Sequence, residues 1–588
     1  MVRKETHEIC RVGQQGRGTA GETEGIRRGK PRPTVQVRLG PGEIWEGPVG
    51  TTLEAFLRVA RPDEADPIVA ALVDGELREL TWPVCRDVEV RPVVLSDRDG
   101  MRVYQRSLTF LLVVAARDLF PQATVTVDHS VALGGFFCQV EGRPPLTKEE
   151  LVRLERRMWE LVEADLPIVR QELPLRDALE IYRRQGFEDK VRLLPYRPKA
   201  YLTLYRLGET YDYFYGYMVP STGYLRWFGL QERPPGFILR FPLRQKPLAL
   251  PPYREHAKLT SVFLEHRAWM EALEVEYVAS LNEAVETGRI REVVLVAEAL
   301  HEQRVADLAR EIARQREHLD LVLVAGPSSA GKTTFTKRLA IQLLTHGIRV
   351  LPIEMDDYFV DREETPRDER GEYDFEALEA LDRELLLEQV QALLAGKEVT
   401  LPRYDFAVGK RRQGRTVSIR SGQLILLEGI HGLNPDLLPG FPRERAFRLY
   451  VSALTQLKVD HHNRISTTDT RLLRRLVRDA KFRGYSAQQT LERWESVRRG
   501  EARDIFPYQE EADAMFNSAL AYELAVLKPL AEPLLRQVEP GTTEYVEAKR
   551  LLSFLEWVLP CNGDLVPDNS ILREFIGGSI LQELSLPG

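Results

Sequence analysis

Cysteine is scarce in this chain. Its 588 residues include 4 cysteines, at Cys10, Cys85, Cys138 and Cys561, and no pair has CxxC or CxxxH spacing. Disulfide-rich scaffolds and zinc sites need such closely spaced ligands. The sequence therefore predicts neither a disulfide framework nor a zinc cage, and a reducing, cytoplasmic compartment fits it best.

Long apolar runs are also missing. The longest, LTFLLVVAA at 108–116, is far shorter than the roughly 20 residues that a membrane helix needs. The first 33 residues are rich in Arg, Lys and Gly and contain no apolar stretch typical of a signal peptide. We therefore expect no membrane span, no secretion and a disordered tail at 1–33.

A strong charge of either sign is absent as well. The formal net charge is −7, with 43% hydrophobic and 29% charged residues, which is ordinary for a globular protein. Contacts with anions must therefore be local. Because a single hydrophobic core rarely grows beyond about 300 residues, the chain should fold as several domains.

The most informative segment follows the apolar stretch at 321–324. From Gly326 to Thr333 the sequence is GPSSAGKT, which matches GxxxxGK[ST], and a helical pattern follows it. In this motif the glycines let backbone amides turn toward phosphate oxygens, beside a helix N-terminus. Lys332 can neutralise phosphate charge, and the Thr333 hydroxyl can bind Mg²⁺. The predicted nucleotide-binding residues are Gly326, Ser328, Ser329, Ala330, Gly331, Lys332, Thr333 and Thr334.

Carboxylates stand at the ends of two other apolar stretches. Asp356 follows the stretch at 350–355, and Glu428 follows the one at 424–427. Ligands of open α/β folds bind at the carboxyl edge of the sheet, where both carboxylates should lie. Asp356 can accept a proton from an attacking hydroxyl, and Glu428 can hold Mg²⁺. A GTPase would have an NKxD motif, and the sequence contains none.

Arginines crowd a later helical region. Helical spacing places Arg471, Arg474, Arg475 and Arg478 on one broad face. Such a face could close over a triphosphate as a lid and stabilise the charge that develops during transfer. A solvated helix surface is the alternative, and the pattern does not decide between them.

Together these segments resemble the uridine kinase and phosphoribulokinase family of P-loop kinases, over roughly 320–530. The matching pieces, in the family's order, are GPSSAGKTT, MDDYF, YDFEALEALD, LPRYDF, LLEGIHGLNP and DTRLLRRLVRD. The resemblance implies that Asp356 is the catalytic base and that Arg474 and Arg478 belong to the lid. Glu428 would lie near Mg²⁺. The implied substrate contacts are Phe359, Asp382 at the ribose hydroxyls, Tyr404 at the nucleoside, Arg471 and Gln489.

The sequence departs from this family at one position. Uridine kinases have a histidine after the YDF motif that contacts the pyrimidine, whereas Gly409 stands at the matching position here. The identity of the acceptor base is therefore left open.

The first 250 residues resemble something else. The segment 34–94 is similar to a TGS domain, and 104–140 is similar to the second additional domain of threonyl-tRNA synthetases. Arg106 and Phe110 occupy the synthetase HxxxH positions, and no CxxxH follows. Without those side chains we expect no hydrolytic chemistry of the editing type.

The predicted fold is an α/β P-loop kinase domain, with a parallel sheet flanked by helices, behind a β-grasp-like TGS domain and an α+β synthetase-like domain. The expected boundaries are a tail at 1–33, the TGS-like domain at 34–96, the synthetase-like domain at 97–255, a helical connector at 256–318, the kinase domain at 319–545 and a C-terminal extension at 546–588.

The expected activity is transfer of the γ-phosphoryl group of ATP, with Mg²⁺, to the 5′-hydroxyl of a nucleoside. Two alternatives stay open: a kinase of sugar phosphates, with Arg403, Lys410 and Arg411 as additional cations, and an RNA- or ribosome-associated regulator. RNA binding by the N-terminal domains and self-association are not decided by the sequence, nor is the choice between ATP and GTP.

Overall fold

The computed structural model describes residues 32–131, 134–253, 255–369, 371–406 and 408–582. The tail expected at 1–33 lies outside them except for its last two residues. Within the described residues no helix is both long and apolar enough to cross a bilayer. Cys138 and Cys561 are free and buried.

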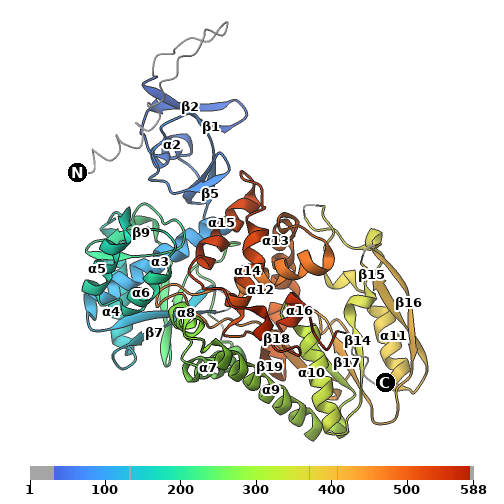
Figure 1. Ribbon diagram of the computed structural model, residues 1–588. Helices are drawn as coiled ribbons and strands as arrows, with labels where there is room; N and C mark the ends of the chain where they lie inside the picture. Colours follow the sequence, from blue (N-terminus) through green and yellow to red (C-terminus); the bar gives the residue numbers. More distant parts are fainter. Residues whose placement is uncertain (1–31, 132–133, 254, 370, 407, 583–588) are drawn as a thin grey trace, which may run out of the picture.

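The N-terminal unit is a sheet that carries one helix (Figure 1). Its strands lie in the order β2-β1-β5-β3-β4, with β1 parallel to β5. Asp74 and Gly75 have positive φ and connect β3 to β4 in a hairpin, a turn that the Asp-Gly dipeptide favours. The elements are β1 (Thr34–Gly40), β2 (Glu43–Pro48), α2 (Leu53–Ala60), β3 (Ile68–Val73), β4 (Glu76–Arg78) and β5 (Val88–Val94).

The second unit packs helices against two antiparallel sheets. One sheet has the order β10-β9-β8 and the other β11-β12-β7-β6. The apolar run at 108–116 lies inside α3 and is buried in the core of this unit. Its elements are α3 (Arg98–Leu119), β6 (Thr124–Val131), β7 (Gly135–Glu141), α4 (Lys148–Glu163), β8 (Val169–Pro174), α5 (Leu175–Gln185), α6 (Glu188–Leu193), β9 (Tyr201–Leu207), β10 (Thr210–Asp212), β11 (Gly229–Arg233) and β12 (Gly236–Arg240).

Arg106 and Phe110 are part of the core of this unit. Phe110 is fully buried, and its ring centroid lies 5.6 Å from that of Phe214. Arg106 donates a hydrogen bond to the carbonyl of Tyr217. An apolar contact and a backbone bond thus stand at the two positions where the synthetase pattern has histidines.

The third unit is a parallel five-stranded sheet with the order β14-β17-β13-β18-β19. Alternate side chains of its strands enter two apolar cores, one on each face of the sheet. Helices α7 (Ala257–Ala272), α8 (Val278–Glu286) and α9 (Ile290–Arg314) precede the sheet. The remaining elements are β13 (Leu321–Ala325), α10 (Lys332–Thr345), β14 (Val350–Glu354), α11 (Arg383–Leu394), β15 (Val399–Asp405), β16 (Lys410–Val417), β17 (Leu424–Glu428), β18 (Ala446–Ser452), α12 (Thr467–Arg478), α13 (Ala487–Asp504), β19 (Ala514–Asn517), α14 (Glu523–Leu535), α15 (Thr543–Leu555) and α16 (Arg573–Ile576).

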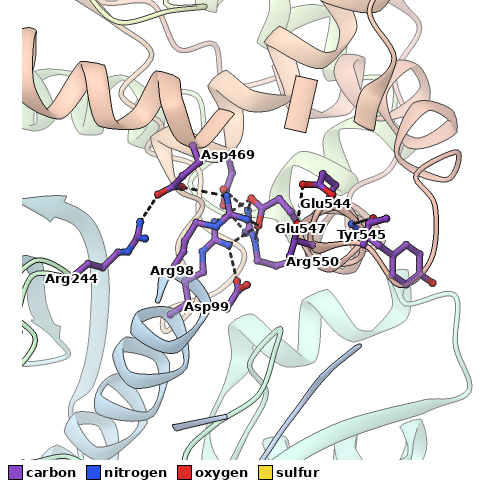
Figure 2. Close-up of polar contacts among 12 residues, drawn as sticks. Arg98, Asp99, Arg244, Asp469, Glu544, Tyr545, Glu547 and Arg550 are labelled. Atoms are coloured by element: carbon purple, nitrogen blue, oxygen red, sulfur yellow. Dashed lines mark hydrogen bonds and ion pairs between the residues drawn. The ribbon is translucent and has the colours of Figure 1, made fainter. Parts of the chain in front are cut away.

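A charge network joins the second unit to the third (Figure 2). Glu547 of α15 is only 2% exposed and forms ion pairs with Arg98 at 3.1 Å, Arg102 at 2.6 Å and Arg550 at 2.8 Å. Arg550 also pairs with Asp469 of α12 at 2.6 Å. Burial alone would raise the pKa of Glu547, but the surrounding guanidinium groups hold it well below its usual range. Helix α3 is thereby tied, through α15, to the first turn of α12.

A second buried cluster joins the same two units. Lys190 of α6 forms ion pairs with Asp212 at 2.9 Å and with Asp460 at 2.8 Å, and its side chain is 3% exposed. Nearby, the backbone amide of Val127 donates to the carbonyl of His461 at 2.8 Å. Because buried charges are costly unless paired, these contacts fix how the two units dock.

Replacing Glu547 by Gln should destabilise the protein by about 3 kcal/mol, because it leaves the three arginine partners without their shared carboxylate. Urea unfolding followed by circular dichroism measures the change. Glu544→Gln is the matched control, because the Glu544 side chain only accepts a hydrogen bond from Thr543 and should change stability by less than about 0.5 kcal/mol. Equal midpoints for the two variants would contradict the stabilising role of the network.

Candidate active site

The predicted phosphate loop lies between β13 and α10, at the carboxyl edge of the parallel sheet. Gly331 has φ of +85° and Ser329 has φ of +59°, so the backbone turns sharply before the helix. A Cβ on Gly326 would lie 1.9 Å from the carbonyl oxygen of Val451, which explains glycine at this position. Lys332 is buried and its Nζ lies 3.4 Å from the carbonyl oxygen of Pro327. The loop has the strand–turn–helix setting that its motif requires.

Arg474 braces this loop from below. Its guanidinium is fully buried, with Nε 2.6 Å from the Glu523 carboxylate and one terminal nitrogen 2.7 Å from the carbonyl of Ser518. The other terminal nitrogen lies 3.5 Å from the carbonyl oxygen of Ala330, which also accepts a bond from the Ser518 hydroxyl. These contacts hold the loop backbone in its turn.

Arg471 has a similar buried place. It donates to both oxygens of Glu501, at 2.7 and 2.6 Å, and that carboxylate accepts the backbone N–H of Ser328 at 3.2 Å. The guanidinium groups of Arg471 and Arg474 are thus held by buried carboxylates, although Nε and one terminal nitrogen of Arg471 have no hydrogen-bond partner among the described residues. Substrate contact by Arg471 and a lid role for Arg474 stay predictions.

The outer arginines of α12 fit the lid expectation better. Arg475 donates to the Ser328 hydroxyl at 2.8 Å, and its side chain is 11% exposed. Arg478 pairs with Asp479 at 2.8 Å at the end of the same helix. Arg475, which the family pattern does not single out, thus contacts the phosphate loop directly.

Two side chains fit a magnesium ion. The Thr333 hydroxyl lies 3.1 Å from Oε2 of Glu428, at the end of β17, which neighbours β13 in the sheet. Burial raises the pKa of Glu428 to about 8, offset in part by Lys332 and reinforced by Glu354 and Asp356. Oxygen ligands are what Mg²⁺ prefers, and a cation would relieve the concentration of negative charge.

Asp356 and Asp357 follow β14 but differ in their surroundings. Asp357 accepts the backbone N–H of Tyr404 at 3.0 Å, so it holds the backbone at Tyr404. Within the described part of the chain, the Asp356 carboxylate has no hydrogen-bond partner. Its negative charge acts on the pKa of Glu376 and of Arg483. Asp356 is therefore available to a substrate hydroxyl.

Glu376 is a site residue that the sequence analysis missed. Its Oε2 is buried without a hydrogen-bond partner, although part of the side chain reaches the surface. Burial raises the pKa of Glu376 to about 7, with contributions from Arg475, Glu501, Lys332 and Asp356. Lys332 and Asp356 are among the charged groups whose electrostatic effect reaches this carboxyl, which makes Glu376 a candidate site residue.

Asp382 has partners within the chain. Its Oδ1 accepts the backbone N–H of Leu385 at 3.0 Å and caps α11, while Oδ2 pairs with Arg411 at 2.6 Å. The contact with ribose hydroxyls expected for Asp382 stays a prediction. Gln489 is likewise used as a cap, because its side chain accepts the N–H of Ser486 at 3.0 Å at the start of α13.

Phe359 and Tyr404 belong to an aromatic cluster. Their ring centroids are 5.6 Å apart, and Tyr404 lies 5.1 Å from Phe406. Both side chains are part of the apolar core on one face of the sheet, and the Tyr404 hydroxyl is buried without a partner among the described residues. Because a buried hydroxyl normally has a hydrogen bond, the Tyr404 hydroxyl is a candidate contact for a polar ligand.

The position of Gly409 is occupied from elsewhere in the chain. Gly409 has φ of +76°, and a Cβ built on it would lie 2.6 Å from Nε of Arg362. Arg362 in turn donates to the carbonyl of Phe406 at 2.8 Å. A guanidinium therefore stands where uridine kinases direct a histidine side chain.

The raised pKa of Glu376 predicts a pH dependence of stability. With a folded-state pKa of about 7 against roughly 4.3 when unfolded, the folded state holds a proton that the unfolded state releases, so stability should fall as pH rises from 5 to 7. Replacing Glu376 by Gln should make this fall smaller by about 1–2 kcal/mol.

Urea unfolding at pH 5, 6 and 7 in EDTA tests this. Glu379→Gln is the matched control, since Glu379 lies in the same segment and is exposed. Identical pH dependence of Glu376→Gln and the control would show that Glu376 does not hold the extra proton.

Two comparisons with known proteins concern this part of the chain. Residues 321–524 match the Phosphoribulokinase / Uridine kinase family. The structure of a possible uridine kinase from Bacillus stearothermophilus is similar at a TM-score of 0.26 and 23% identity, covering 37% of this chain and 98% of that one.

A different class of relative supports the synthetase-like region. Threonine–tRNA ligase of Symbiobacterium thermophilum is 32% identical over 197 residues, which are 33% of this chain and 30% of the ligase. The ligase of Halorhodospira halophila is 34% identical over 201 residues, or 34% of this chain and 31% of the ligase. The chain thus spans about a third of the length of these relatives. The family match supports a P-loop kinase domain in the C-terminal half.

Proposed function

We propose that the protein is an ATP- and Mg²⁺-dependent kinase that transfers the γ-phosphoryl group to the 5′-hydroxyl of a nucleoside. The observation that carries this proposal is the Asp356 carboxylate, which follows β14 at the carboxyl edge of the sheet and has no hydrogen-bond partner among the described residues. Phosphoryl transfer needs a positioned acceptor and charge stabilisation more than covalent chemistry. The phosphate loop and this carboxylate supply these elements.

The residues divide the work in the following way. Backbone amides of the loop and Lys332 bind the phosphates, and Asp356 orients the acceptor hydroxyl and takes its proton. Arg475 and Arg478 border the loop on the outer side and would stabilise charge on the transferred group. Bound by Thr333 and Glu428, Mg²⁺ would neutralise phosphate charge. Arg471 and Arg474 keep the loop preorganised from below.

For the acceptor, we assign the ribose hydroxyls to Glu376 and the flat base to Phe359 and Tyr404. Glu376 has a free carboxyl oxygen beside Asp356, whereas both oxygens of Asp382 are already bonded. Ionised carboxylates are strong acceptors for sugar hydroxyls. This assignment moves the predicted ribose contact from Asp382 to Glu376, which belongs to the same YDFEALEALD segment.

A second candidate acceptor is a sugar phosphate. The guanidinium of Arg362 stands at the position of the missing histidine, and Arg411 lies beyond it on β16. Guanidinium groups recognise phosphate through paired hydrogen bonds. The acceptor panel described below distinguishes this alternative from a nucleoside.

Two further expectations stay proposals. The N-terminal units could serve an RNA-linked regulator, in which case RNA affinity would fall steeply with salt. A cytoplasmic location fits an enzyme that uses a nucleoside triphosphate, and self-association is not assigned.

The decisive measurement is ADP release from ATP and Mg²⁺ across a panel of nucleosides and sugar phosphates. We expect one acceptor class to raise the rate, and expect Lys332→Ala and Asp356→Asn each to lower kcat by at least about a hundredfold. ATP turnover that no acceptor changes, or a rate that survives Asp356→Asn, would contradict the proposed kinase activity.

Substitutions of Glu376 and Asp382 should differ in their effect on KM for the acceptor. Glu376→Gln should raise KM for the acceptor about tenfold or more, because a charged hydrogen bond to a hydroxyl is lost, while the Kd of ADP stays within about twofold. Asp382→Asn should lower the unfolding midpoint with a smaller change in KM, since it weakens the cap of α11. The opposite pattern would return the ribose contact to Asp382.

A further inference from the structure

The chain does not end at the kinase core. After α15, residues 561–582 run back across the molecule, and α16 lies beside α10 (Figure 1). We call residues 561–582 the C-terminal strap. None of its residues takes part in the mechanism proposed above, yet it covers the phosphate loop.

The strap contacts the loop at two points. The Cγ2 atom of Ile571 lies 2.4 Å from where a Cβ on Gly331 would stand, so its side chain rests on the loop backbone. The carboxylate of Glu574 accepts the backbone N–H of Thr334 at 3.0 Å. Thr334 is the third residue of α10, within the GxxxxGKTT segment predicted to bind phosphate.

A carboxylate at this amide imitates a phosphate oxygen. The first amides of a helix have no partner within the helix and carry positive partial charge, which favours an anion. The negative charge of Glu574 also acts on Glu428, one of the acidic groups that face the loop. A triphosphate bound to the loop would meet this carboxylate at the same donor, and two anions cannot share it.

Other contacts hold the strap in place on both sides of Glu574. Lys337 of α10 donates to the carbonyl of Leu581 at 2.8 Å. Lys481, just after α12, donates to the carbonyl of Ile576. The guanidinium carbon of Arg474 lies 5.1 Å from the ring centroid of Phe575. The strap therefore bridges the loop helix and the arginine helix.

Upstream, the strap is firmly anchored. The hydroxyl of Ser570 donates to Glu298 at 2.5 Å, and Ser570, Ile571 and Leu572 are fully buried. Beyond them Glu574 is half-buried, whereas Phe575 and Ile576, directly after it, are buried. A nucleotide that displaces Glu574 from the loop by moving the backbone would therefore also have to free Phe575 and Ile576 from their packing.

We propose that the C-terminal strap is an intramolecular competitor of the donor nucleotide, with Glu574 holding the place of a phosphate on the Thr334 amide until the nucleotide displaces it. This inference rests on the proposed binding of a nucleotide by the loop. It gives the enzyme a lower affinity for the donor than the open loop would have, and couples donor binding to release of the chain end.

The test compares the Kd of MgADP, by isothermal titration calorimetry, for wild type, Glu574→Ala and Glu574→Gln. Loss of one competing charge at a helix N-terminus should tighten binding about threefold to tenfold in Glu574→Ala, with a smaller gain in Glu574→Gln, which keeps a hydrogen-bond acceptor. Asp568→Ala is the matched control, because Asp568 is an exposed acid of the same strap and should leave the Kd unchanged.

A second measurement needs no variant of the strap. Hydrogen exchange of the peptide covering 573–582 in wild type should speed up when MgADP is added, and not in Lys332→Ala. If wild type binds MgADP but Glu574→Ala binds it equally or more weakly, or exchange of the peptide slows, Glu574 is not a competitor. If wild type and all variants fail to bind MgADP, nucleotide binding itself is wrong, and the competitor role is overturned with it.

Discussion

The buried arginines of α12 are the constraint on which the rest of the site depends. A loop of eight residues with inward amides has little packing of its own, and its shape must be imposed from outside. Arg474 does so through the carbonyl of Ala330, and Arg471 through Glu501 and the amide of Ser328. Since each guanidinium is itself neutralised by a buried carboxylate, neither can relax without exposing an unpaired charge. The phosphate loop is consequently held rigidly on the side that Arg471 and Arg474 contact, and it can adjust only on its other side.

Ion pairs also link helix α12 to the N-terminal half of the chain. Asp469 lies in the first turn of α12 and pairs with Arg550, which shares Glu547 with two arginines of α3. In the synthetase-like unit Phe110 is packed against Phe214 in the core. This unit contacts the kinase-like unit through the charge network around Glu547.

Sequence reasoning was most successful where the signal is contiguous. The phosphate loop follows its strand and precedes its helix as predicted, and the Asp74–Gly75 hairpin follows from turn chemistry alone. Helical spacing gathered Arg471, Arg474, Arg475 and Arg478 on one face, but spacing cannot tell whether a face points to a core. Their partners Glu501 and Glu523 are distant in the chain, and only the tertiary structure brings them together.

Two of the helix caps had a local signal in the sequence. Ser486 followed by Gln489 has the spacing of a capping box, and Asp382 stands directly before a helical pattern, so both caps could have been predicted. Glu376 had no such signal, because its raised pKa comes from burial in the folded protein. The C-terminal strap was equally invisible, since a short irregular segment carries no periodicity that would indicate where it folds back.

The network around Glu547 has a consequence for inheritance. Charges of opposite sign are divided between the synthetase-like half and the kinase half, so neither half carries a balanced set by itself. A recombination event that exchanged one half for that of another protein would leave arginines without carboxylate partners in one half, or carboxylates without arginine partners in the other. The two halves are therefore expected to diverge as a unit, with substitutions at Arg98, Arg102, Asp469, Glu547 and Arg550 correlated across family members.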